Sequence, residues 1–361
     1  MIPKYWYIDD SQERNNIARG LINLNKLKVE AQMPNTWQTI ISETQKGSLN
    51  GLLLDWQLQR EEEAGDYSSA SLAQHLRVLA TEGSLTDLPI VLCSAQDGFT
   101  RKYKQDLTTH DLFDMVYHKD DLSEDHTQDE FIALANGYKE LNKNNKMPHG
   151  ILGISEPDYA RLDIRFQAEF KRFFDLGSPA HQIAQFLLRE VLEYQGILID
   201  EDVLAARLGV AKSSPDWEKL KAQLDSAKYK GVFGDAWERW WWFEVEKWCE
   251  QKMGDISLQN TSSTKRVNLL KNALPDLQDL VPASPTEYSN SDDFWTVCYA
   301  TKKPLDYFDG FKTNIHLHYE WQEPIYVSNF AVLEYGSKVE GKWELSPTEI
   351  NRFEEFKNRH R

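Results

Sequence analysis

Acidic residues stand at the ends of two apolar segments in the N-terminal part of the sequence. Asp9 and Asp10 follow the segment KYWYI (residues 4–8), and Asp55 closes the segment GLLLD (residues 51–55). Three carboxylates held close together repel one another and raise one another's pKa, so they need a cation. Hard oxygen ligands of this kind suit Mg²⁺. The pattern therefore predicts a magnesium site at Asp9, Asp10 and Asp55.

Two further residues could complete a site for phosphoryl chemistry. Ser94 follows the apolar segment at 88–93, and Lys119 follows the segment at 115–118. A lysine opposite the carboxylates adds fixed positive charge, and a serine hydroxyl adds a hydrogen-bond donor. Such a set can accept a phosphoryl group on one carboxylate and neutralise its oxygens.

The elements that must position these residues alternate between strand and helix over residues 1–145. Apolar runs and spacings of three and four predict strands at 4–8, 27–31, 51–55, 88–93 and 115–118, and helices at 11–24, 35–46, 69–80 and 129–141. Such alternation predicts an α/β fold, a doubly wound five-stranded parallel sheet with helices on both faces. The carboxyl ends of parallel strands share one edge, where open α/β sheets bind ligands.

This arrangement resembles the receiver domain of response regulators, of the chemotaxis-receiver type, with its flavodoxin-like fold. The family has an acidic pair after the first strand, a phosphoacceptor aspartate after the third, Ser or Thr after the fourth and Lys after the fifth. The resemblance implies that Asp55 accepts a phosphoryl group from a sensor histidine kinase or a phosphotransfer protein. It also implies that Ser94 bonds a phosphoryl oxygen and that Lys119 pairs with it.

The same resemblance implies a ligand set for Mg²⁺. The ion would sit on Asp10, Asp55 and the backbone carbonyl of Gln57, with Asp9 helping through water. Each residue alone also has a structural interpretation, since Asp10 could cap the first helix. The occurrence of all four sequence features in order, at strand ends, favours the functional interpretation.

The sequence departs from the family pattern around the last strand. The family has an aromatic residue three positions before the lysine, where this chain has Val116, and Tyr117 follows it. Asp120 replaces the usual proline after the lysine, and the segment after Asp55 is long and acidic. We therefore expect intact acceptor chemistry with a weak version of the usual aromatic switch.

The rest of the chain predicts a different architecture. After the receiver domain at 1–145, residues 146–158 form a linker with two prolines and two glycines, and residues 159–361 form a mainly α-helical output or interaction domain of no identified family. Helices are predicted at 159–176, 179–194, 202–208, 215–228 and 235–253.

A tryptophan-rich segment dominates the predicted domain at 159–361. On a helix over 235–253, one broad face would hold four of its tryptophans: Trp237, Trp240, Trp241 and Trp248. Such a stripe is either a buried core face or an anchor for a partner, because tryptophan is enriched at interfaces. Tyr138 and Leu141 on the closing helix of the receiver are further candidates for an interaction surface.

Composition restricts the classes of partner. The net charge of −16 argues against a protein that coats nucleic acid, which needs clustered Lys and Arg. Three dispersed cysteines, no signal peptide at the N-terminus and no apolar run of membrane-spanning length predict a cytoplasmic protein without membrane contact. The segment LAARLGV (204–210) resembles a helix-turn-helix, but the following helix mixes Asp and Glu with Lys.

We interpret the chain as a bacterial response regulator of a two-component phosphorelay that acts through protein contacts. It would serve as an adaptor or a phosphate sink. This arrangement resembles multi-component signalling systems, some of them in bacterial phage defence. Association of two copies into a homodimer is a further protein contact that we consider. Alternatives are a DNA-binding transcription regulator and a receiver fused to an enzymatic effector. No separate active site is evident, and His316 and His318 lack a recognisable set of further metal ligands.

Overall fold

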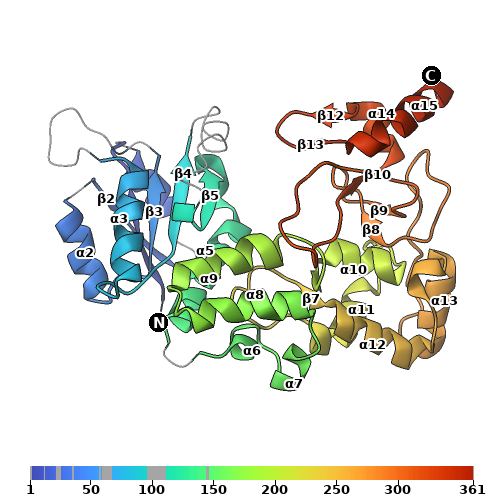
Figure 1. The fold of residues 1–361 in the computed structure, drawn as a ribbon, viewed down its shortest axis with the longest axis horizontal. Helices are drawn as coiled ribbons and strands as arrows, with labels where there is room; N and C mark the ends of the chain where they lie inside the picture. The colour runs from blue at the N-terminus through green and yellow to red at the C-terminus, as the bar shows by residue number, and fades with distance from the viewer. Residues whose placement is uncertain are drawn as a thin grey trace. The chain divides into compact units, whose positions relative to one another are not determined.

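The computed structural model describes residues 2–11, 13–21, 26–34, 36–56, 58, 67–95, 111–143 and 146–360. Its N-terminal part is built on one five-stranded parallel sheet in the order β2-β1-β3-β4-β5 (Figure 1). The strands are β1 (Lys4–Ile8), β2 (Lys28–Gln32), β3 (Gly51–Asp55), β4 (Ile90–Ser94) and β5 (Met115–His118). This strand order and the parallel pairing confirm the predicted doubly wound, flavodoxin-like receiver fold.

Helices cover both faces of this sheet. The described helices are α1 (Arg14–Gly20), α2 (Trp37–Gln45), α3 (Ser69–Thr81) and α5 (Asp125–Leu141). Alternate residues of β1 and β3, such as Trp6 and Leu52, share a core with α2 and α3. Tyr5 points to the other face, where its hydroxyl donates to the carbonyl oxygen of Phe131 in α5 at 2.6 Å. The strands therefore bury both faces, as their continuous apolar runs predict.

The unit that contains the sheet extends beyond residue 145. Contacts define one compact unit of residues 1–189 and 230–237 and a second of residues 190–229 and 238–361. The segment predicted as a linker at 146–158 carries two short helices and lies within the first unit. The boundaries of the two compact units therefore differ from the predicted domain boundaries. The domains at 1–145 and 159–361 stay a prediction. The added helices are α6 (Pro148–Ile151), α7 (Glu156–Tyr159), α8 (Ile164–Asp175) and α9 (Ala180–Phe186).

Residues of the first unit that lie far apart in sequence pack against α5. At Gly137 in α5 an added Cβ would come within 2.2 Å of the Phe233 ring, so a glycine is needed for this approach. The α9 helix also packs on α5, and its His181 contacts Asp87, the residue three positions before β4, at 2.7 Å. These contacts explain why the unit includes the segment at 230–237 and the helices after 145.

The second unit is mainly helical, as predicted for this part of the chain, with several two-stranded pairs. Its helices are α10 (Glu201–Leu208), α11 (Trp217–Gln223), α12 (Trp242–Met253), α13 (Ser263–Ala273), α14 (Asn329–Tyr335) and α15 (Ile350–His360). Its strand pairs are β6 (Leu198–Ile199) with β7 (Trp240–Trp241), β8 (Thr296–Val297) with β9 (Pro304–Leu305), β10 (Phe311–Lys312) with β11 (Tyr326–Val327), and β12 (Lys338–Val339) with β13 (Trp343–Glu344).

Short turns of tighter or wider helix link these elements. They are η2 (Lys119–Ser123), η3 (Leu187–Leu192, a π-helix), η4 (Asp225–Ala227), η5 (Leu258–Asn260) and η6 (Pro347–Glu349). In the part of the chain that the structure describes, no helix combines the length and apolar character that crossing a membrane requires.

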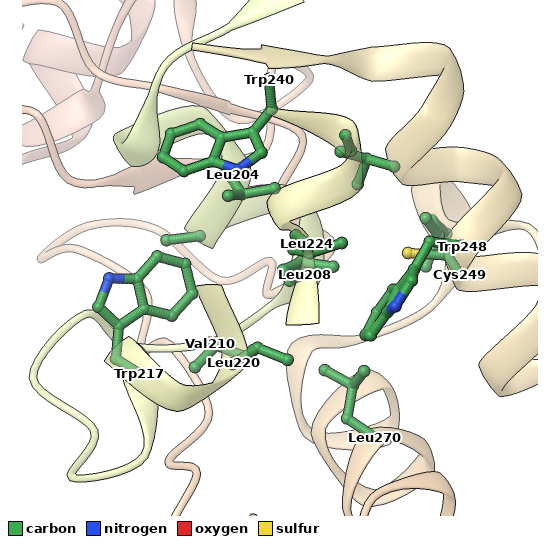
Figure 2. Close-up of a cluster of buried hydrophobic side chains, with 14 of the residues drawn as sticks. Leu204, Leu208, Val210, Trp217, Leu220, Leu224, Trp240, Trp248, Cys249 and Leu270 are labelled. Carbon is green, nitrogen blue, oxygen red and sulfur yellow. The ribbon is translucent and has the colours of Figure 1, made fainter. Parts of the chain in front are cut away.

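The tryptophan-rich segment folds differently from the predicted helix. The helix begins only at Trp242, because Trp240 and Trp241 form β7 and pair antiparallel with Ile199 and Leu198. Figure 2 shows the Trp240 and Trp248 side chains directed into a cluster with leucines of α10 and α11. The helical stripe was therefore a wrong prediction over 237–241.

Packing also corrects most of the predicted interaction surface. Trp240, Trp241 and Trp248 belong to the core, and Trp237, in the other unit, is half-buried beside Phe233. Tyr138 and Leu141 are buried as well. The Tyr138 hydroxyl donates to Asp114 at 2.5 Å instead of facing solvent. In the folded chain these side chains stabilise the units and are not available to a partner, with the half-exposed Trp237 as the exception.

Candidate functional site

The carboxyl edge of the sheet brings the predicted acidic residues together. Asp9 and Asp10 directly follow β1, and Asp55 is the last residue of β3, whose Leu54 pairs with Ile8. One carboxylate oxygen from each of the three aspartates lies within 4.8 Å of the other two. Asp9 and Asp55 are buried and Asp10 is half-buried. The register of the parallel strands therefore explains how residues far apart in sequence share one site.

Lys119 joins two of these carboxylates. It is the first residue of η2, directly after β5, and its Nζ lies 2.8 Å from Oδ2 of Asp9 and 2.7 Å from Oδ1 of Asp55. The lysine side chain is largely buried. Burial alone would lower the pKa of Lys119, but hydrogen bonds from Nζ to Asp55 and Asp9 outweigh it and raise that pKa. The ammonium group therefore stays charged between two carboxylates.

Asp9 is held from three sides. Besides Lys119, the hydroxyl of Tyr7 donates to Oδ2 at 2.5 Å and the backbone N–H of Ser11 donates to Oδ1 at 2.6 Å. Burial would raise the pKa of Asp9, but the bonds from Lys119 and Tyr7 lower it below its ordinary value. Tyr7 was not among the site residues predicted from the sequence. Its position two residues before Asp9, on the same side of an alternating strand, is the signal that could have found it.

The donor set fits a divalent cation. Three carboxyl groups stand against one ammonium group, and hard oxygen ligands of this kind suit Mg²⁺. This is the sole group of three or more potential ligands found among the residues that the structure describes. The predicted fourth ligand, the backbone carbonyl of Gln57, lies outside the described residues.

Ser94 lies at the end of the neighbouring strand. It is the last residue of β4, is buried, and pairs in register with His118, the residue before Lys119. Cys93, opposite Asp55 in the register, is also buried, and burial raises the pKa of its thiol. The Cys93 thiol is therefore neutral and a poor nucleophile.

The last strand, β5, departs from the receiver pattern at Val116 and Tyr117, and these two side chains pack on opposite sides of the sheet. Val116 is partly buried and packs against the core between the sheet and α2 and α3. Tyr117 faces the opposite way, where its ring makes an edge contact with Phe131 at 5.6 Å and its hydroxyl bonds Glu130. The aromatic side chain on β5 is therefore already packed against α5.

Two alternatives from the sequence gain no support from the structure. In α11, the candidate recognition helix, Trp217 and Leu220 are buried and the lysines are ion-paired: Lys219 with Asp216 at 2.7 Å, and Lys221 with Glu201 at 2.7 Å. His318 contacts Glu190 at 2.8 Å, and no third potential metal ligand joins it among the described residues.

Comparisons with known proteins were made by family model, by sequence and by structure. No family model matches this chain, and no curated protein matches it. Among solved structures, Salmonella typhimurium RcsB matches with a TM-score of 0.28 and 13% identity, over 51% of this chain and 88% of that chain. The phosphorylated cyanobacterial phytochrome response regulator RcpA matches with a TM-score of 0.24 and 10% identity, over 41% and 98%.

A second RcsB structure, from Salmonella enterica serovar Typhimurium, gives a similar result. It is bound to the promoter rprA in the presence of BeF₃⁻, and it matches with a TM-score of 0.27 and 12% identity, over 52% of this chain and 98% of that chain. Similarities this low carry no argument about function. The assignment of a receiver fold rests on the strand order and the register described above.

Proposed function

We propose that this protein is a response regulator that accepts a phosphoryl group on Asp55 from a histidine kinase or a phosphotransfer protein. The observation that carries the proposal is Lys119, whose ammonium group bridges Asp9 and Asp55 at the carboxyl edge of a receiver-fold sheet. In the transfer, the P–N bond of a phosphohistidine breaks and an O–P bond forms on Asp55. The departing imidazole keeps the electron pair and takes a proton from water.

Each residue of the site has a role in this chemistry. Asp55 attacks as a carboxylate, and Lys119 pairs with the new phosphoryl oxygens. Ser94, at the end of the adjacent strand, donates a hydrogen bond to one of these oxygens. Asp10, Asp55 and the backbone carbonyl of Gln57 would hold Mg²⁺, with Asp9 helping through water, and the ion would neutralise charge that develops on the phosphoryl group.

We further propose that the second unit acts through protein contacts, as an adaptor or as a phosphate sink. The net charge of −16 and the ion-paired lysines of α11 support protein contacts over DNA binding. Duplex binding with a steep salt dependence would reverse this preference.

The proposal is tested by intact-mass measurement after incubation with acetyl phosphate and Mg²⁺. We expect one phosphoryl adduct on the wild-type chain and none on Asp55→Asn. Asp120→Asn is a matched control, because the Asp120 side chain is 89% exposed and lies next to Lys119 without joining the carboxylate cluster. The control should be labelled like the wild type. Equal labelling of Asp55→Asn would overturn the assignment.

A further inference from the structure

The second unit contains a cavity of about 240 Å³ that no part of the proposed phosphoryl chemistry uses. It is smaller than the roughly 300–1,000 Å³ typical of pockets for drug-sized ligands, so it suits a metabolite-sized molecule. Its walls come from distant parts of the sequence: the chain around Tyr194, the start of α10, the residue before β7, the β8–β9 turn and the chain before β11.

Two cations in the wall lack a carboxylate partner. Arg239 donates to the carbonyl oxygens of Leu192, at 2.6 and 2.8 Å, and of Glu238, at 2.9 Å. No carboxylate of the described chain lies within ion-pair distance (4.0 Å) of its guanidinium, or of the Lys302 ammonium. Burial lowers the pKa of Arg239 although several carboxylates lie further away. An anion in the cavity would therefore be favoured by this partly desolvated charge.

The carboxylates in the same wall have other partners or neighbours. Asp200 caps α10 by accepting from the Val203 N–H at 2.9 Å, and it also accepts from Gln195 Nε2 at 2.8 Å. Glu323 is paired with the buried Arg207. The third carboxylate, Glu193, lies near Tyr194, and after burial it is the main cause that raises the pKa of that phenol to about 12. The wall thus offers a ligand two cations without a carboxylate partner, while Asp200 and Glu323 already have partners of their own.

Lys302 is fixed by its backbone. It has φ of 55°, a left-handed conformation that lysine rarely adopts, and its N–H donates to the Cys298 carbonyl at 2.8 Å in the β8–β9 turn. Its ammonium group lies 5.1 Å from the centre of the Tyr299 ring. Non-glycine residues in this conformation cluster at ligand sites. The turn therefore holds a cation and an aromatic ring together at the cavity.

The remainder of the wall is apolar or aromatic. Val297, Ile315 and Ile325 line it together with Tyr194 and Tyr299. Such surfaces bury an aromatic ring well, and the tyrosine hydroxyls can bond a polar substituent. We propose that this cavity binds a small aromatic carboxylate, with its ring against the tyrosines and its anionic end facing Arg239 and Lys302.

Three probes that share a 4-hydroxyphenyl ring and carry an anionic, a neutral or a cationic end group test this proposal on the full chain. They are 4-hydroxyphenylacetate, its neutral amide and the cationic tyramine, each titrated with binding followed by ligand-detected NMR. The carboxylate should bind saturably and at least roughly tenfold more tightly than the amide, and tyramine should bind least. Equal affinities, tightest binding of tyramine, or no saturable binding of the carboxylate would overturn the proposal.

Single-residue variants test whether the carboxylate probe binds in this cavity. Lys302→Gln should weaken binding of the carboxylate roughly tenfold and leave the affinity for the amide unchanged. Lys303→Gln is the matched control, because Lys303 is exposed like its neighbour Lys302 but does not line the cavity. Asp55→Asn should leave the affinity unchanged, since Asp55 belongs to the other unit. If Asp55→Asn abolishes binding, or if Lys302→Gln has no effect, the carboxylate binds elsewhere and the proposal fails.

Discussion

The hydroxyl of Tyr7 lies 2.5 Å from Oδ2 of Asp9, the same oxygen that Lys119 contacts. Both Tyr7 and Asp9 are fully buried. A buried carboxylate costs free energy unless its hydrogen-bonding capacity is filled. Tyr7 is therefore a positioning residue. It fixes Asp9 next to Asp55, the proposed phosphoryl acceptor, and does not itself take part in phosphoryl transfer.

Tyr7→Phe should lower the free energy of unfolding by about 1.5–3 kcal/mol, because it removes a hydrogen bond to a charged group. Tyr5→Phe is the matched comparison, since Tyr5 is equally buried in β1 but donates to a backbone carbonyl, a bond worth about 0.5–1.5 kcal/mol. Denaturant titration of the three chains measures the difference. A Tyr7→Phe chain as stable as the wild type would show that this bond contributes nothing.

Magnesium should stabilise the first unit. Asp9, Asp10 and Asp55 keep an excess of negative charge beside Lys119, so a bound cation relieves repulsion. At a hundredfold excess over the dissociation constant, mass action gives about 2.7 kcal/mol. Thermal unfolding with and without MgCl₂ should show this gain in the wild type and little of it in Asp10→Asn. A wild-type melting temperature that is unchanged by Mg²⁺ would argue for a site that does not bind the metal.

Breaking a buried charge network should destabilise the same unit. Arg77 in α3 contacts Asp87 at 2.8 Å and Asp114 at 2.9 Å, and Asp87 also contacts His181 of α9. Removing the Asp87 charge leaves Arg77 with Asp114 as its remaining carboxylate and takes the carboxylate contact away from His181. Asp87→Asn should therefore cost about 3 kcal/mol at pH 7, measured by denaturant titration. The exposed Asp120→Asn should stay within about 0.5 kcal/mol of the wild type.

The effect of Asp87→Asn should depend on pH. Burial would raise the pKa of Asp87, but the Arg77 charge and the His181 hydrogen bond lower it below the ordinary 3.8. A carboxylate with a lowered folded-state pKa stabilises the fold fully above its unfolded pKa, and this contribution is lost as the pH falls through the folded value. The stability gap between wild type and Asp87→Asn should thus be constant from pH 7 to 5 and shrink below pH 3.8. A gap that widens in acid would contradict this assignment.

Phosphorylation should change association only weakly. Val116 is partly buried against the core, and Tyr117 is already held by Phe131 and Glu130, so no aromatic ring on β5 remains to move inward. We expect a beryllofluoride mimic of the phosphoryl group to shift the dissociation constant of a homodimer or partner complex by less than about tenfold. Analytical ultracentrifugation or calorimetry with and without the mimic measures this shift. A hundredfold tightening would restore a conventional switch.

The sequence predicted the fold best in the strands of the sheet, above all in those that are buried on both faces. The strands at 4–8, 51–55 and 115–118 were predicted with their observed bounds. The first two are buried on both faces, and such a parallel strand reads as a short apolar run that ends in polar residues, whereas the strand at 115–118 is half-buried. The acidic residues and Lys119 could be found for the same reason, since each directly follows such a run or closes it.

Features set by distant contacts could not be read from local patterns. The spacing of Trp237, Trp240 and Trp241 fits a helix, but β7 forms because it pairs with β6, some 40 residues earlier in the chain. Tyr138 looked available for a partner on an amphipathic helix, and only tertiary packing places it against Asp114. The Arg77 network was missed because charged residues on a helix are usually solvated.

The most direct test of the central claim is to locate the modified residue. The chain is phosphorylated with acetyl phosphate and Mg²⁺ and then reduced with borohydride, which converts a phosphorylated aspartate to homoserine. Peptide mass spectrometry then identifies the altered position. We predict homoserine at position 55 alone, with none formed when Mg²⁺ is withheld. Homoserine at position 9 or 10, or none anywhere under labelling conditions, would contradict the assignment of Asp55 as the phosphoryl acceptor.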